Sequence, residues 1–203
     1  TLRGATEVNV SANMDGLATM SDAAAGWMPG LRLNDARTLG EVLETLPANR
    51  PDEIDALVRL LENPASPYAL PGAVSLERHD CIHVLLGRGL LGADEAFVVG
   101  YTMGAAASSI DAELLDTFKL IAKRLYPRHY RMDDADLFVF DLGYQLGTRS
   151  PVRIDHLPLE HARAERIDAL RARAGIDVTA LVAVYAAERA LFPDARASAR
   201  LLV

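Results

Sequence analysis

Apolar residues recur along this chain at the three- and four-residue intervals of an α-helix. The stretch 109–126 shows the pattern most clearly, because five apolar residues fall on one face of a helical wheel: Ile110, Leu114, Phe118, Ile121 and Leu125. Ser109 or Asp111 would cap the start of this helix. No segment shows sustained alternation of apolar and polar residues, and 136–140 is the only run with a strand-like composition. The pattern therefore predicts an all-α protein.

Further helices are predicted wherever a similar pattern lies between helix-start and helix-stop signals. Their ranges are 38–47, 51–64, 75–87, about 94–106, 133–146, 159–174 and 176–193. Thr38 and Glu41 have the spacing of a capping box, and Pro51 suits the first turn of a helix. We therefore expect a multi-helix bundle of about seven to nine helices. It should form a single domain over residues 31–203, preceded by a loosely ordered N-terminal segment over residues 1–30.

The composition narrows the class of protein. The net charge is −7 and no run of Lys or Arg dominates, which argues against a nucleic-acid-binding protein. Cys81 is the only cysteine, so the chain cannot form an internal disulfide, and a reducing compartment is favoured. No apolar run approaches the roughly 18–20 residues that span a bilayer, and residues 1–20 contain no apolar signal-peptide core. We therefore expect a cytoplasmic protein.

The most informative stretch is RHDCIHVLLGRGLLGADE, residues 78–95, which places titratable residues in largely apolar surroundings. On a helix with about 100° between successive residues, His79, Asp80 and His83 lie within an arc of about 100°. Their side chains can therefore converge on one point, as two histidines one turn apart do in metal-binding helices. Cys81 falls on the far side of the same helix, which predicts a buried thiol that binds no metal.

A fourth titratable group follows His83 after eleven residues. Three glycines in between let the chain turn, so that Glu95, or its neighbour Asp94, can face back toward the histidines. Two imidazoles and two carboxylates suit Zn²⁺, and two histidines with one carboxylate also suit Fe²⁺. The alternative is a buried salt-bridge cluster that involves Arg78, or a set of capping residues at a helix start. We favour a divalent-metal site, because a cation removes the cost of an unpaired buried carboxylate.

The residues His79, Asp80, His83 and Glu95 resemble the HDxxH-x11-E signature of the coenzyme Q (ubiquinone) biosynthesis protein 4 family. The surrounding sequence is similar as well. An arginine precedes the motif, HVLLG continues from its second histidine, and LLGADE leads to the glutamate. The resemblance extends over roughly residues 35–180 and includes the downstream segments LGYQLG and LRARAGI.

This resemblance implies an all-helical protein that binds zinc, or another divalent metal such as iron, through His79, Asp80, His83 and Glu95. It also implies peripheral association with a membrane, which in a eukaryote is the matrix side of the mitochondrial inner membrane. The expected partners are a polyprenylated quinone precursor or another isoprenoid lipid, other quinone-biosynthesis enzymes, and a second copy of the chain in a homodimer. The expected role is oxidative decarboxylation at carbon 1 of the precursor ring, or organisation of the biosynthetic enzymes around that precursor.

Two other functions fit the same residues. In a non-catalytic lipid-binding scaffold the metal is structural and has four protein ligands, whereas a catalytic site keeps one position open. In a plain helical interaction protein there is no metal. Both the enzyme and the scaffold require an apolar cavity of isoprenoid or fatty-acyl size near the metal-binding helix, where the small residues at 104–109 would leave room.

Overall fold

The computed structural model describes residues 22–47, 61, 63–128 and 130–202. Within these ranges the regular structure is helical, and the only β-type pairing is an isolated bridge between Thr38 and Arg166. The predicted all-α class is therefore confirmed. The strand-like run at 136–140 lies inside a helix, because the N-cap residue Asp133 starts that helix just before it.

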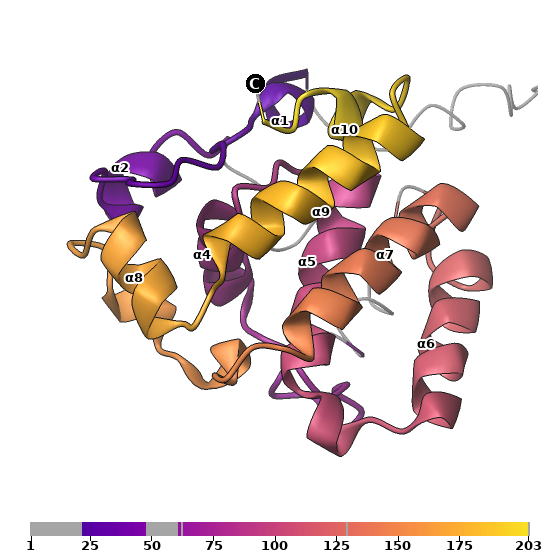
Figure 1. Cartoon of the computed structure of the whole chain (residues 1–203). Coiled ribbons are helices and arrows are strands. Elements are labelled where there is room, and N and C mark those ends of the chain that lie inside the picture. The colour runs from indigo at the N-terminus through magenta and orange to yellow at the C-terminus, as the bar shows by residue number, and fades with distance from the viewer. Residues whose placement is uncertain (1–21, 48–60, 62, 129, 203) are drawn as a thin grey trace, which may run out of the picture.

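Nine α-helices and three short 3₁₀-helices make up the described part of the chain (Figure 1). The α-helices are α1 (Asp22–Gly26), α2 (Leu39–Leu43), α4 (Leu76–Leu86), α5 (Gly92–Ala105), α6 (Ala112–Arg124), α7 (Asp134–Gly147), α8 (Ile167–Arg173), α9 (Val178–Leu191) and α10 (Arg196–Ala199). The 3₁₀-helices are η3 (Ala107–Ser109), η4 (Ile154–His156) and η5 (Leu159–His161). The helix predicted over 51–64 lies almost entirely outside the described residues and stays a prediction.

Local capping signals start helices where the sequence placed them. Thr38 and Glu41 form the predicted capping box of α2, in which the Glu41 N–H donates to Thr38 Oγ1 at 3.2 Å and the Thr38 N–H donates to Glu41 Oε2 at 2.6 Å. At α6 the cap is Asp111 rather than Ser109, since Asp111 Oδ1 accepts from the Leu114 N–H at 2.8 Å. These caps satisfy backbone donors that a helix leaves free at its start.

The segment predicted as one helix over 159–174 is divided into η5 and α8. Its middle pairs with the chain that enters α2. The Leu39 N–H donates to the Glu165 carbonyl at 2.9 Å, and the Ile167 N–H donates to the Arg37 carbonyl at 2.9 Å. These bonds use backbone groups that a continuous helix would keep for itself. Long-range pairing therefore interrupts the predicted helix.

Residues 22–30 belong to the packed domain. Ala24 and Trp27 are buried, and Trp27 Nε1 donates to Thr45 Oγ1 at 3.0 Å. The domain therefore begins before residue 31, the boundary expected from the sequence. Residues 1–21 lie outside the described part of the chain, and the loosely ordered segment predicted there stays a prediction.

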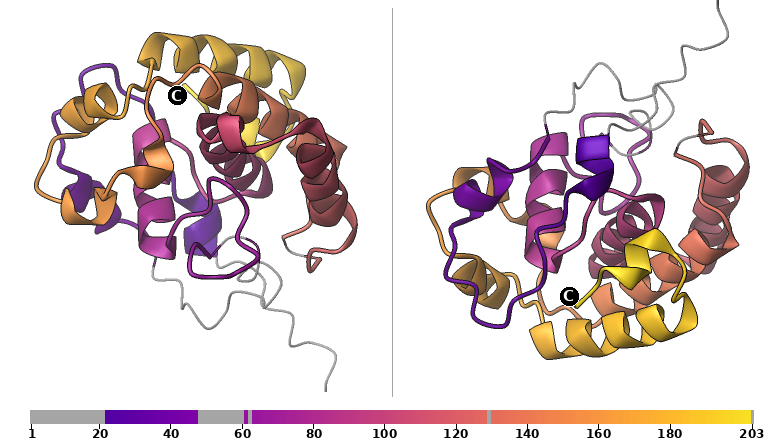
Figure 2. Two further views of the ribbon diagram at one scale, coloured as in Figure 1. Left: turned by 90° about the horizontal axis from the view of Figure 1, so that it is seen from below. Right: turned by 90° about the horizontal axis from the view of Figure 1, so that it is seen from above.

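The centre of the fold is the pair α5 and α7, which lie side by side (Figures 1 and 2). Each helix carries two glycines four residues apart that face the other helix: Gly100, Gly104, Gly143 and Gly147. A Cβ atom at any of the four would collide with a backbone carbonyl oxygen of the opposite helix. The bare glycines therefore let the two backbones touch, which is the packing typical of GxxxG motifs.

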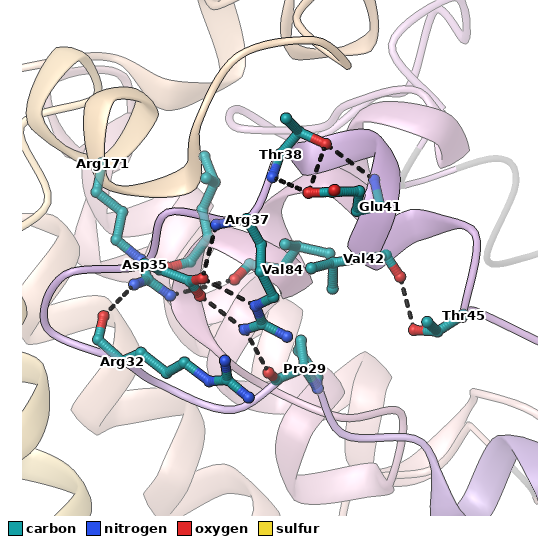
Figure 3. A network of polar contacts seen from close by, with 11 residues as sticks. Pro29, Arg32, Asp35, Arg37, Thr38, Glu41, Val42, Thr45, Val84 and Arg171 are labelled. Atoms are coloured by element: carbon teal, nitrogen blue, oxygen red, sulfur yellow. Dashed lines mark hydrogen bonds and ion pairs between the residues drawn. The ribbon is translucent and has the colours of Figure 1, made fainter.

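The C-terminal end of α4 is anchored by side chains from α8 and α9. Arg171 is buried, and its guanidinium donates to the carbonyls of Leu85 and Arg32, each at 2.7 Å (Figure 3). The Tyr185 hydroxyl donates to the Leu86 carbonyl at 2.7 Å. The last carbonyls of a helix have no partner within the helix, so these bonds both satisfy them and fix the position of α4.

The helix α6 lies at the rim of the molecule (Figure 2). Phe118 and Ala122 are buried and pack in a cluster with Phe140 of α7. Leu125, which the periodicity placed on the same face, is 65 % exposed. That part of the prediction is wrong, because the helix ends at residue 124 and Tyr126 takes the buried position instead.

Candidate metal site

Two histidines meet on one face of α4. The helix starts after Ser75, whose hydroxyl accepts from the Arg78 N–H at 3.3 Å. His79 and His83 follow one turn apart, and their rings lie edge to face with centroids 4.6 Å apart. The side chain of His83 is fully buried and that of His79 is 18 % exposed. The convergence predicted from their spacing is therefore present.

Glu95 completes a three-residue group from the first turn of α5. The chain reverses after Gly87, which ends α4 with a φ of 73°, a left-handed conformation that favours glycine. Glu95 Oε2 lies 3.3 Å from His83 Nε2 and 3.7 Å from His79 Nε2, and the three ligand atoms lie within 4.8 Å of one another. Bonds of about 2.1 Å in a tetrahedral zinc site place ligand atoms about 3.4 Å apart. Both Glu95 distances are close to that spacing.

Asp80, the fourth ligand expected from the sequence, is not part of this group. Its side chain is half-buried on the same helix. Burial raises the pKa of its carboxyl to about 6; the charge on His83 opposes the rise, and the charges of Glu95 and Glu77 add to it. The structure thus brings together three of the four expected ligands, and ligation by Asp80 stays a prediction.

The contacts of Asp94 show which of the two acidic residues at the start of α5 faces the histidines. Asp94 is fully buried, and its Oδ2 accepts from Arg200 Nη2 at 2.5 Å and from the Leu91 N–H at 3.1 Å. Its Oδ1 lies 3.7 Å from Arg88 Nη1. The carboxylate of Asp94 is therefore held by two arginines, and Glu95 is the residue that faces the histidines.

Burial and the attraction between His83 and Glu95 determine the pKa values of the group. Burial lowers the pKa of His79 to about 4, and the adjacent His83 contributes to this, so the His79 ring is neutral near pH 7. Burial also opposes charge on His83, but the Glu95 carboxylate outweighs it and raises the pKa of His83. Desolvation opposes charge on Glu95 as well, yet the same attraction lowers its pKa. His79 Nε2, which faces Glu95, is buried without a hydrogen-bond partner among the described residues, and a cation at the site would give it one.

Cys81 is buried and lies outside the ligand group, as predicted. Burial raises the pKa of its thiol to about 12, and the charge of Asp80 contributes. The thiol therefore stays protonated near neutral pH, and a protonated thiol is neither a nucleophile nor a good metal ligand.

Arg78 ties the start of α4 to a different part of the chain. Its guanidinium donates to both carboxylate oxygens of Glu160, at 2.9 and 2.6 Å, and to the Asp155 carbonyl at 2.6 Å. In the described part of the chain Arg78 therefore takes no part in the group of His79, His83 and Glu95, so a buried salt-bridge cluster that involves Arg78 is not found there. Arg78 instead fixes the end of α4 that carries His79.

A buried ion pair between Arg88, which follows α4, and Glu188 of α9 was not expected from the sequence. Arg88 is fully buried and donates to the carboxylate of Glu188 through both Nη atoms. Its guanidinium contacts the rings of both Phe97 and Tyr185, 4.0 and 4.2 Å from their centroids, and Ser198 Oγ donates to Glu188 at 2.9 Å. The available signal was an arginine between two glycines in an apolar stretch. Its partner lies 100 positions along the chain, which no local pattern reveals.

Two cavities are lined by described residues in other places. One has a volume of about 130 Å³ and lies beside Tyr101 and Ser150, and the other has a volume of about 400 Å³ and lies beside Arg128 and Arg131. Neither is lined by a residue of α4. The lipid-sized cavity expected near the metal-binding helix therefore stays a prediction.

Comparisons of the chain with models of protein families, with curated proteins and with solved structures give no match. The functional interpretation therefore depends on the geometry of the three ligand residues and on the resemblance of the HDxxH-x11-E motif. Among the described residues, no helix combines the length and the apolar character that crossing a bilayer requires.

Proposed function

We propose that this protein binds one divalent metal ion through His79, His83 and Glu95. The observation that carries the proposal is the convergence of their ligand atoms from two helices, with 3.3 and 3.7 Å between Glu95 Oε2 and the two imidazoles. Two imidazoles and one carboxylate form a donor set used for both Zn²⁺ and Fe²⁺. Zinc is our first choice, because the two distances from Glu95 Oε2 to the histidines are close to the ligand spacing of a tetrahedral site.

A site with three protein ligands leaves a position for water or substrate, which is typical of catalytic rather than structural zinc. This supports an enzyme over the alternative function, a non-catalytic lipid-binding scaffold with a structural metal. A structural site needs a fourth ligand. Asp80 would have to change its conformation to supply one, since it lies outside the group of three.

The proposed substrate is a polyprenylated quinone precursor, and the proposed reaction is oxidative decarboxylation at carbon 1 of its ring. The carboxyl group leaves as CO₂, a hydroxyl from water replaces it, and dissolved O₂ accepts the two electrons and becomes H₂O₂. The support is the resemblance of His79, Asp80, His83 and Glu95 to the signature of the coenzyme Q biosynthesis protein 4 family. When bound, the metal supplies Lewis-acid or redox chemistry. The imidazoles of His79 and His83, which are neutral when they ligate, would hold it on the more buried side, and Glu95, whose side chain is 34 % exposed, would be the ligand nearest to solvent.

The same proposal includes the setting in which the reaction takes place. A polyprenylated precursor resides in a membrane, so the protein would contact the membrane peripherally and meet the other quinone-biosynthesis enzymes there. If the scaffold alternative holds, the metal site stabilises the fold and the protein organises those enzymes without turning over the precursor. Turnover by the purified protein separates the two functions.

The test uses an aromatic precursor with a short prenyl chain and a ¹³C-labelled carboxyl on ring carbon 1, supplied in detergent with dissolved oxygen. Metal-loaded protein should release labelled CO₂, and His79→Ala and His83→Ala should not. His156→Ala is the matched control, because the His156 side chain is 68 % exposed and lies outside the ligand group. Equal release by all variants would contradict the proposed site, and metal binding without release would favour the scaffold.

A further inference from the structure

We propose that the C-terminal segment of the chain positions the metal ligand Glu95, although it supplies no ligand itself. The connection runs through Asp94, the residue that precedes Glu95 in the first turn of α5. This inference rests on the proposed metal site and deepens it, because it identifies what fixes the geometry of that site. The C-terminal groups involved are Glu188 of α9 and Arg200 after α10, which are far from α4 and α5 in the sequence.

Four charged residues form what we call the Asp94 charge group: Arg88, Asp94, Glu188 and Arg200. Two cations balance two anions, and Arg88, Asp94 and Glu188 are fully buried. Asp94 Oδ2 accepts from Arg200 Nη2 at 2.5 Å, and Arg88 Nη1 donates to Glu188 Oε1 at 3.0 Å. Burying such charges is favourable only when they are paired and hydrogen-bonded, so the group holds its members in one arrangement.

Arg200 also joins the group to the N-terminal part of the domain. Its Nη1 donates to the carbonyls of Ala25 and Trp27, at 3.0 and 3.4 Å. The guanidinium therefore bridges α1, the segment after α10 and the first turn of α5. A lysine carries the same charge but lacks the two-pronged donor geometry that makes these contacts together.

The position of Glu95 depends on the Asp94 charge group, because the Glu95 side chain is less buried than the side chains of the two histidines. His83 is fully buried, whereas the Glu95 side chain is 34 % exposed. Asp94 fixes the first turn of α5 by accepting from the Leu91 N–H at 3.1 Å while it is held by Arg200. The distance from Glu95 to the histidines is therefore set by the placement of that turn. Groups that orient a ligand from behind typically change metal affinity about 10- to 100-fold when they are removed.

Gly89 provides an independent observation. A Cβ atom at this position would lie 2.5 Å from Arg200 Nη2, 2.9 Å from Asp94 Oδ2 and 2.6 Å from the Trp27 carbonyl oxygen. Gly89 is not one of the glycines with positive φ, so the backbone itself accepts alanine. Gly89→Ala would therefore push the Arg200–Asp94 ion pair apart without removing any charge from the protein.

The test is a Co²⁺ titration of the full chain, followed by the visible absorption of the bound ion, which reports on its coordination. We expect Arg200→Ala and Gly89→Ala to bind Co²⁺ at least about tenfold more weakly and with an altered spectrum. Arg200→Lys should lie between these variants and wild type. Phe118→Leu in α6 is the control: Phe118 packs against Tyr126 and Phe140, so the variant lowers the unfolding midpoint without changing a ligand or a member of the Asp94 charge group, and it should leave Co²⁺ affinity unchanged.

Wild-type affinity and spectrum in folded Gly89→Ala and Arg200→Lys would overturn the positioning role, even if Arg200→Ala does not fold. A drop in affinity for Phe118→Leu as large as that of Gly89→Ala would also overturn it, because the effect would then follow from stability alone. Failure of the wild-type protein to bind Co²⁺ is a different result. It would contradict the proposed metal site rather than its positioning.

Discussion

Asp94 and Glu95 are consecutive residues of α5, yet their carboxylates have different partners: Asp94 Oδ2 lies 2.5 Å from Arg200 Nη2, and Glu95 Oε2 lies 3.3 Å from His83 Nε2. Successive side chains on a helix point about 100° apart, so one can face the buried arginines while the next faces α4. Two acidic residues that are equivalent candidates in the sequence therefore have separate roles, one structural and one as a ligand.

Replacing the two carboxylates of the motif, Asp80 and Glu95, should have different effects on metal affinity. Glu95→Gln removes an anionic ligand and should weaken Zn²⁺ binding, while Asp80→Asn should change it little, because Asp80 lies outside the group of three. Isothermal titration of Zn²⁺ into each variant measures the affinity and the stoichiometry. If Asp80→Asn loses as much affinity as Glu95→Gln, the site has four ligands and the structural-metal scaffold gains support.

Metal affinity should decrease as the pH falls, because an imidazole must be neutral to bind a metal. The pKa of His79 is about 4, so this ring is neutral over most of the accessible range. Burial opposes charge on His83, but Glu95 raises the pKa of this ring above 6.5, so protons compete for His83 first. At a pH above the raised pKa of His83, metal affinity should be constant. As the pH is lowered, affinity should already begin to fall before pH 6.5 is reached.

Titrations of Zn²⁺ between about pH 5.5 and about pH 8.5 measure this dependence. Glu95→Gln provides a check on the cause, because removing the Glu95 charge should shift the fall in affinity to lower pH. An affinity of the wild-type protein that stays constant across the whole range would contradict imidazole ligation.

Adding a side chain at a glycine in the contact between α5 and α7 should lower the free energy of unfolding. In Gly143→Ala the new methyl group would collide with the Phe97 carbonyl oxygen, so the two helices would have to separate. Overpacking of this kind costs about 1–3 kcal/mol, and here the upper end is expected because the obstacle is backbone. Urea unfolding measures the loss.

Gly26→Ala is the matched control for that substitution. Gly26 is also helical, but nothing lies within 4 Å of the position that its new methyl group would take, so the free energy of unfolding should not decrease. Gly143→Ala with wild-type stability would show that α5 and α7 are not in backbone contact.

The parts of the fold that depend on local signals could be predicted from the sequence. Caps at Thr38 and Asp111 act within one turn, so they mark helix starts reliably. The interruption between η5 and α8 could not be predicted, because it comes from pairing of Glu165 with Leu39, which are distant in the chain. The facing glycines of α5 and α7 were visible as GYTMG and GYQLG, but only the structure shows that the two motifs meet.

The candidate site likewise has a part that local spacing predicts and a part that depends on contacts between distant residues. His79 and His83 belong to one helix, and helical spacing was enough to place them together. The choice of Glu95 over Asp94 depends on Arg200, which lies 106 positions beyond Asp94 in the chain. Asp80 shares the arc of the histidines on a helical wheel. The wheel does not show the side from which Glu95 approaches, and that side decides which residues form the group.

The metal content of protein purified without chelator is the most direct test of metal binding by His79, His83 and Glu95. Elemental analysis should find one divalent ion per chain in wild-type protein and in the control His156→Ala, and almost none in the double variant His79→Ala/His83→Ala. The Nε2 atoms of the two histidines and the Glu95 carboxylate would then have a common partner. Equal metal content in the double variant and the wild type would contradict the account, as would wild-type protein that takes up no metal when Zn²⁺ or Fe²⁺ is supplied.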